Sequence, residues 1–162
     1  IKIDKTAHTG VEGLYACGEA TGGMHGADRI GGLSSANGIV FGRIAGASAA
    51  LAAQKEPETA LKADIALPRY GITTTDAERL THGLKHTMST YCMINRTETG
   101  LSEALQQLES LQDKAMALSK PHADDSEIAA LARLQSQIRL AQEMVKAMRK
   151  RTESLGSHYR AD

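Results

Sequence analysis

A glycine-rich stretch near the start of the sequence gathers the side chains best suited to chemistry. Residues 13–43 read GLYACGEATGGMHGADRIGGLSSANGIVFGR. Glu19 stands at the end of a short apolar run, where a carboxylate can accept hydrogen bonds from ribose or ribityl hydroxyls. Arg29 keeps its charge at every physiological pH, and its planar fork can bind a carboxylate through two hydrogen bonds. His25 could donate to the same ligand.

Two serines, Ser34 and Ser35, stand where the following helix is expected to begin. Free backbone N–H groups and the positive end of the helix dipole favour an anion or an electron-rich ring oxygen there. Glycine-rich strand–turn–helix units are nevertheless common. From residue types and spacing alone, Arg29 fits contact with a ligand and an ion pair with a protein carboxylate equally well.

The elements that must position these residues form an α/β pattern over residues 1–54. IKID and GLYACGEA are short, strand-like segments separated by KTAHTGVE, which has turn character. SSANGIVFGRIAGASAALAAQ predicts a buried helix whose small residues let neighbouring backbone approach closely. A strand, a glycine-rich turn and a buried helix belong to a nucleotide-binding layout. No apolar run is expected to approach the ~20 residues that span a bilayer.

The pattern changes near residue 55. Residues 55–74 carry two of the three prolines and are predicted to be a linker. Residues 75–162 predict an all-α, antiparallel three-helix bundle, its first helix interrupted by Gly83. The predicted core stripes are Leu101, Leu105, Leu108, Leu111 and Leu118 in the second helix, and Ile128, Leu131, Leu134, Ile138, Ala141, Val145 and Met148 in the third. Asp124, Asp125 or Ser126 can cap the third helix.

The overall composition excludes several classes of protein. Nineteen basic and nineteen acidic side chains balance, so no net charge attracts nucleic acid. Four Tyr, one Phe and no Trp leave few aromatic rings for stacking on bases or sugars. Cys17 and Cys92 form no zinc-type spacing and are predicted to be reduced thiols. The sequence opens on Ile1 without a signal peptide, as a fragment or trimmed chain would.

Three segments carry a family resemblance. GLYACGEATGGMHGADRIGG…FGR resembles the C-terminal part of the FAD-binding domain in the succinate dehydrogenase/fumarate reductase flavoprotein family, which includes L-aspartate oxidase. LKHTMSTYCMINRTETGLSEALQQLESL resembles the start of the three-helix domain that follows in this family. RTESLGSHYRAD resembles the signature E-S-R-G-[AS]-H-x-R of that domain. The resemblance covers nearly the whole chain, in family order.

This resemblance implies roles for single residues. Glu19 aligns with the glutamate that hydrogen-bonds FAD, and Arg29 with the arginine that binds a substrate carboxylate above the flavin. Ser34 and Ser35 align with the pair whose backbone meets the pyrimidine edge of the flavin, where the helix dipole favours the negative charge of the reduced ring. The implied cofactor is FAD, and the implied reaction moves a hydride between flavin and a dicarboxylate of the fumarate or succinate type. None of these residues is itself expected to be catalytic.

Departures from the family pattern leave the substrate open. Asp28 replaces the usual asparagine, Leu33 replaces a position that is often asparagine, and Leu155 replaces the arginine of the E-S-R-G signature. An L-aspartate oxidase-like enzyme, or another acid-oxidising flavoenzyme, therefore fits as well. The alternative of a different class is a non-catalytic helical interaction module, which has no need of residues 13–35.

Two parts of the family pattern are missing from the sequence, namely the G-x-G-x-x-G fingerprint and the capping domain. The chain is therefore expected to be the C-terminal portion of a longer flavoprotein and to be inactive by itself. Its expected partners are the missing N-terminal portion and an iron–sulfur or other electron-transfer subunit, with no nucleic acid. The expected location is the cytoplasm, or the inner membrane surface through partner subunits.

Four further features allow a simple and a functional interpretation. His82 and His86 could chelate a metal, although a solvated helix face is the simpler interpretation, because no third ligand is near. Arg96 is predicted to be a helix-end cation. Residues 158–160 fit equally well a contact with the flavin domain or a partner and a solvated end. Residues 144–151 are basic and predict the wet face of a helix, or contact with an acidic partner.

Overall fold

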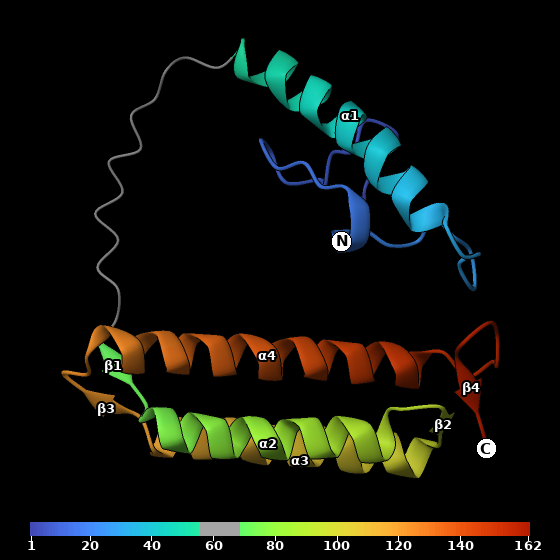
Figure 1. The fold of residues 1–162 in the computed structure, drawn as a ribbon. Coiled ribbons are helices and arrows are strands. Elements are labelled where there is room, and N and C mark those ends of the chain that lie inside the picture. Colours follow the sequence, from blue (N-terminus) through green and yellow to red (C-terminus); the bar gives the residue numbers. More distant parts are fainter. Residues whose placement is uncertain (56–68) are drawn as a thin grey trace. The chain divides into compact units, whose positions relative to one another are not determined.

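The computed structural model describes residues 1–55 and 69–162, which belong to two compact units (Figure 1). The units divide between Asp64 and Ile65. Most of the predicted linker, 55–74, falls on residues 56–68 and therefore lies outside the described residues. The end of that range, from Tyr70 onward, already contributes a strand and a core side chain to the second unit.

The first unit contains a short 3₁₀ helix, η1 (Gly18–Ala20), and one long helix, α1 (Leu33–Ala53). The predicted strands IKID and GLYACGEA do not form. In the described part of this unit the chain makes turns and a single isolated bridge between His8 and Tyr15. The side chain of Asp4 accepts hydrogen bonds from the backbone N–H groups of Thr6 and His8, which folds the first segment back on itself instead of extending it.

Helix α1 confirms the helix predicted from its small residues. Its N-cap is Gly32, and it packs closely against η1, because a Cβ added at Gly42 would lie 3.9 Å from Cys17 Sγ. The expectation that no apolar run approaches membrane-spanning length is wrong for α1. Alone among the described helices, its 21 residues are long and apolar enough for that role by length and composition. Core helices of soluble proteins meet the same criteria, so α1 is not assigned to a membrane.

The second unit is the predicted three-helix bundle (Figure 1). Its helices are α2 (Thr74–Tyr91), α3 (Glu98–Ala117) and α4 (Asp125–Lys150). Two short strand pairs tie the ends of the bundle together. β1 (Tyr70–Gly71) pairs antiparallel with β3 (Lys120–Pro121), and β2 (Asn95–Arg96) pairs parallel with β4 (Tyr159–Arg160).

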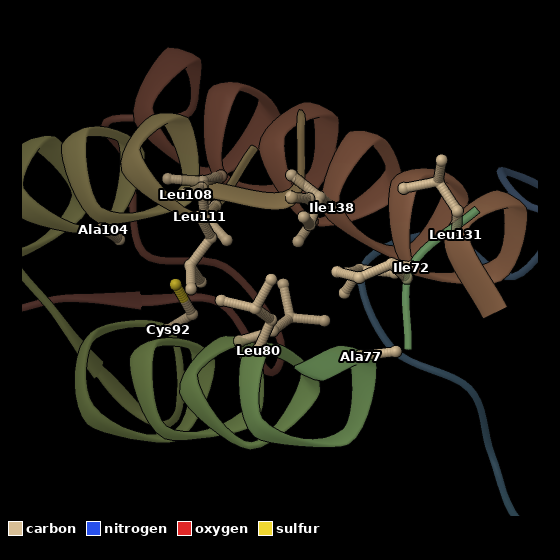
Figure 2. Close-up of a cluster of buried hydrophobic side chains, with 14 of the residues drawn as sticks. Ile72, Ala77, Leu80, Cys92, Ala104, Leu108, Leu111, Leu131 and Ile138 are labelled. Atoms are coloured by element: carbon tan, nitrogen blue, oxygen red, sulfur yellow. The ribbon is translucent and has the colours of Figure 1, made fainter. Parts of the chain in front are cut away.

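Apolar side chains from all three helices meet in one core (Figure 2). Burial of each large apolar side chain contributes roughly 1.5–3 kcal/mol. Most of the predicted stripe positions are buried, but Leu118 is 40% exposed because it follows the last residue of α3. Ile72, just ahead of α2, is fully buried although no helical pattern includes it. The largest fully buried side chains are Ile72, Leu101, Leu108, Leu134, Ile138 and Val145.

The predicted interruption at Gly83 is wrong, because α2 runs through this residue without a break. A Cβ added at Gly83 would lie 3.2 Å from Leu111 Cδ2. The glycine therefore allows α2 and α3 to approach closely, and packing offsets its low helix propensity.

Residues after α4 return to the opposite turn of the bundle. Arg160 is buried, and its guanidinium donates to the carboxylates of Asp162, at 2.9 Å, and Glu98, at 3.4 Å. His158 Nδ1 lies 3.0 Å from Arg96 Nη1. Arg96 Nε also donates to the carbonyl of Cys92 at the end of α2, which confirms its prediction as a helix-end cation. Arg160 is thus neither solvated nor available to another domain.

The basic stretch 144–151 partly pairs within the chain. Lys146 forms an ion pair with Glu143, and Arg149 forms one with Glu98. Both cysteines are free thiols; Cys92 is buried, and this burial raises its pKa.

Candidate functional site

A cavity of about 470 Å³ lies in the first unit between η1, the glycine-rich loop and the first turns of α1. The structure brings all five candidate residues to its wall: Glu19, His25, Arg29, Ser34 and Ser35. The remaining lining residues are Gly18, Thr21, Asn37 and Gly38. Residues 19 positions apart in sequence therefore share one small volume, which fits part of a ligand larger than a single ion.

Glu19 is held by the short helix η1. Gly18 adopts a left-handed conformation with φ of 67°, and Thr21 closes the turn by donating both its N–H and its hydroxyl to the carbonyl of Gly18, at 3.0 and 2.7 Å. The Glu19 side chain is exposed. Its carboxylate can therefore accept hydrogen bonds from a ligand in the cavity.

Arg29 is exposed, and its guanidinium has no carboxylate within ion-pair distance in residues 1–55 and 69–162. The neighbouring acid, Asp28, accepts a hydrogen bond from the backbone N–H of Arg29 at 2.8 Å. Asp28 thus fixes the backbone of the arginine rather than neutralising its side chain. Of the two alternatives from sequence, the described residues offer no partner for the structural ion pair.

The start of α1 offers fewer free amides than expected. The N–H of Leu33 donates to the carbonyl of Ile30 at 3.3 Å, and that of Ser35 donates to Gly32 at 3.2 Å. No side chain caps the helix, and the N–H of Ser34 has no acceptor among the described residues. One free amide and the positive end of a 21-residue helix therefore face the cavity.

Asn37 is a wall residue that sequence reasoning missed. Its side-chain nitrogen Nδ2 lies 3.2 Å from His25 Nε2, and its oxygen Oδ1 is buried with no hydrogen-bond partner in the described chain. Its position three residues after Ser34 places both on one face of the helix. That spacing was the available signal, but an asparagine within a helix is common on any exposed face.

The other candidate residues do not form a second centre. In the part of the chain that the structure describes, no group of three or more His, Cys, Asp or Glu side chains could hold a metal ion. His82 lies in a groove of about 460 Å³ between α2 and α4 with Lys85 and Arg133, and His86 does not line it.

Comparison with known proteins decides the family. Residues 81–162 match the fumarate reductase flavoprotein C-terminal domain, and residues 1–35 match an FAD-binding domain. The chain belongs to the succinate dehydrogenase/fumarate reductase flavoprotein family. The expected family, its mixed α/β and helical fold, and FAD as the cofactor are thereby confirmed.

Individual members of this flavoprotein family are similar over the whole chain. It is 32% identical to an FAD-dependent oxidoreductase of Methanocaldococcus jannaschii and 30% identical to one subunit of the CoM/CoB fumarate reductase of Methanothermobacter marburgensis. Each alignment covers 100% of this chain and 31% of the relative. A mutant form of E. coli quinol fumarate reductase FrdA has a TM-score of 0.83 and 28% identity, covering 100% of this chain and 30% of that one. The chain thus spans about a third of the length of its curated relatives.

The cavity residues fit part of the cofactor of this flavoprotein family. FAD carries hydroxyl donors that an exposed carboxylate such as Glu19 accepts, and ring oxygens that a free amide such as that of Ser34 binds. The buried, unpaired Oδ1 of Asn37 adds a polar atom that the described chain does not satisfy. Such atoms are rare in proteins and cluster where ligands bind.

Proposed function

We propose that this chain forms the flavin-facing and carboxylate-binding end of an FAD-dependent oxidoreductase that acts on a dicarboxylate of the succinate or fumarate type. The observation that supports this most is the position of Arg29. Its guanidinium lines the same cavity as Glu19 and Ser34 and has no carboxylate partner among the described residues.

In this proposal Arg29 binds one substrate carboxylate. A guanidinium and a carboxylate form two parallel charge-assisted hydrogen bonds, which fix the orientation of the acid as well as its position. His25 contributes a second donor from the same wall. Fixing one end of the substrate holds its reacting carbons in one place, and such orientation lowers the entropic part of a barrier.

Glu19 and the start of α1 hold the cofactor in this proposal. Glu19 accepts hydrogen bonds from cofactor hydroxyls, and the free N–H of Ser34 donates to a ring oxygen, with Ser35 beside it. The positive end of α1 stabilises negative charge on that edge of the ring. Bound FAD supplies the hydride acceptor or donor.

The chain by itself is proposed to be inactive, and the whole enzyme to need the N-terminal portion of the flavoprotein. An iron–sulfur or other electron-transfer subunit is the proposed partner, and it would hold the enzyme at the inner membrane surface or in the cytoplasm. One precedent is the Xenopus laevis relative, a mitochondrial succinate dehydrogenase flavoprotein subunit, which is 29% identical over 94% of this chain.

The decisive experiment replaces Arg29 in the full-length flavoprotein. We expect Arg29→Ala to retain FAD and to lose about 10- to 100-fold in kcat/KM for fumarate reduction, because charge-assisted hydrogen bonds contribute about 1.5–3 kcal/mol. Arg29→Lys should recover only part of this loss, since an ammonium cannot bind a carboxylate through a planar fork.

Arg139→Ala is the matched control, because Arg139 is an exposed arginine of α4 far in sequence from the cavity. It should leave turnover unchanged. Normal fumarate turnover by the FAD-loaded Arg29→Ala variant would contradict the clamp. Oxidation of L-aspartate in place of fumarate or succinate turnover would move the enzyme to the L-aspartate oxidase type.

A further inference from the structure

We propose that Asn37 is a positioning residue for His25, holding the ring so that Nδ1 carries the proton and is the donor offered to a bound acid. The inference deepens the proposed function, on which the identity of that acid rests. It starts from one contact, between Asn37 Nδ2 on α1 and His25 Nε2 on the glycine-rich loop, 3.2 Å apart. Both residues are half-buried and line the cavity that also contains Arg29.

The chemistry of the two groups fixes the position of the proton. An amide NH₂ only donates, so Nε2 of His25 must accept and cannot carry a hydrogen. In the neutral ring the single proton then lies on Nδ1. No described residue is hydrogen-bonded to Nδ1, whereas Nε2 is engaged by Asn37. The free nitrogen is therefore the one that donates.

The unpaired oxygen of Asn37 argues against a purely structural role for this side chain. Oδ1 is buried without a partner in the described chain, and the contact with His25 is the only hydrogen bond found there for the amide. A structural asparagine in a helix commonly bonds to backbone or neighbouring side chains through both amide atoms. Here the histidine alone fixes the amide.

The charges around His25 make the neutral asparagine significant. Glu19 from η1 and Arg29 from the loop line the same cavity, and Asp28 lies beside Arg29 in sequence. A carboxylate at position 37 would favour the imidazolium directly, whereas an amide does not. With Asn37 the cavity holds one permanent cation, Arg29, and one neutral donor, His25. That pair suits one ionised carboxylate and one further acceptor oxygen.

The test is NMR titration of His25 in the full 162-residue chain, which needs no turnover. Wild type should have the Nδ1–H tautomer by its ring ¹⁵N shifts. Asn37→Ala should lose this preference and move to the Nε2–H form of a free histidine. Asn37→Asp keeps the shape of the side chain and should raise the His25 pKa by about one unit or more, because the new carboxylate stabilises the imidazolium.

Gln106→Glu is the control, since it makes the same amide-to-acid change on the exposed face of α3. It should leave the tautomer and the pKa of His25 unchanged. An identical tautomer and pKa in wild type, Asn37→Ala and Asn37→Asp would overturn the inference. An Nε2–H tautomer in wild type would overturn it as well.

A kinetic arm separates this inference from the proposed function. In the full-length flavoprotein, Asn37→Ala should raise KM for the dicarboxylate several-fold with FAD content unchanged, and Asn37→Asp should shift the pH profile of kcat/KM upward. If His25 responds in the NMR titration but no dicarboxylate is turned over, the proposed function fails and the positioning role stands. If Arg29→Ala impairs turnover while both Asn37 variants match wild type in every readout, the positioning role fails alone.

Discussion

The backbone of Gly71 lies directly against the first turn of α4 at Glu127. A Cβ added at Gly71 would stand 2.7 Å from the carbonyl carbon of Glu127 and 2.5 Å from the Cβ of Ala123. The next residue, Ile72, donates its N–H to the Glu127 carbonyl at 3.2 Å and is fully buried. This close approach lets the chain enter the bundle core just before α2 begins.

Gly71→Ala should therefore destabilise the bundle. The methyl group would meet backbone that cannot move without shifting the start of α4, and overpacking of this kind costs about 1–3 kcal/mol. We expect the urea midpoint of the helical unit, followed by far-UV circular dichroism, to fall accordingly.

Gly83→Ala is the matched control for this change. There the added methyl meets only the flexible end of Leu111, at 3.2 Å, and alanine gains about 1 kcal/mol of helix propensity over glycine. The net effect should be close to zero. Equal losses in the two variants would refute the assignment of Gly71 to a backbone contact.

The cap of α4 gives a second prediction. Asp124 accepts the N–H of Glu127 at 2.9 Å, and the Glu127 carboxylate accepts the N–H of Asp124 at 3.3 Å. Asp124→Ala should cost about 1 kcal/mol of unfolding free energy, since it removes a helix cap. Asp125→Ala removes the same charge in the first turn without removing the cap, and should cost only a few tenths of a kcal/mol. Calorimetric melting of both variants compares them, and a larger loss for Asp125→Ala would contradict the assignment.

The bundle could be predicted from sequence because its signal is local and repeated. Apolar residues recur every three or four positions along α3 and α4, and Asp124 is one of three candidate caps named in advance. Gly83 misled the prediction because helix propensity describes an isolated helix, whereas the partner Leu111 lies 28 positions further along the chain. Two-residue strands such as β1 and β2 are too short to leave a periodic pattern.

The cavity was predictable only in part. Glu19, Arg29 and the serines were suggested by residue type, spacing and family resemblance, and they do share one cavity. Asn37 could not be singled out, because its role depends on the loop folding back to bring His25 against α1. The strands expected before the cavity failed for a similar reason. Strand formation depends on a pairing partner, and the local sequence of residues 1–20 does not encode one.

Asp28 gives a prediction for the site itself. Its carboxylate accepts the Arg29 N–H, so Asp28→Asn should keep the loop in place while removing a negative charge near the clamp. In the full-length flavoprotein we expect KM for a dicarboxylate to fall about three- to tenfold at low salt, and the difference to shrink at high salt. Asp28→Ala loses the acceptor too and should raise KM above that of Asp28→Asn. Identical KM values for wild type and Asp28→Asn at low salt would exclude an electrostatic effect of Asp28.

The last prediction concerns acid and the C-terminal strand. Hydrogen bonds from the Arg160 guanidinium, helped by the backbone N–H of Glu98, lower the pKa of Asp162 from 3.8 to about 2. A hydrogen bond from Arg149 likewise lowers the pKa of Glu98. Because both folded-state pKa values lie below the ordinary values, these carboxylates stabilise the bundle above pH 4, and that stabilisation is lost as the pH falls toward 2.

Asp162→Asn should therefore be less stable than wild type by a constant amount from pH 7 to about pH 5, and the two should converge between pH 4 and 2. Urea titrations of the full chain at each pH measure the difference. Asp113→Asn is the control, because Asp113 is exposed on α3 and has no ion pair among the described residues. Its difference from wild type should not change with pH in this range. A gap between wild type and Asp162→Asn that stays constant down to pH 2 would mean that the Arg160 pairing does not hold β4 to the bundle.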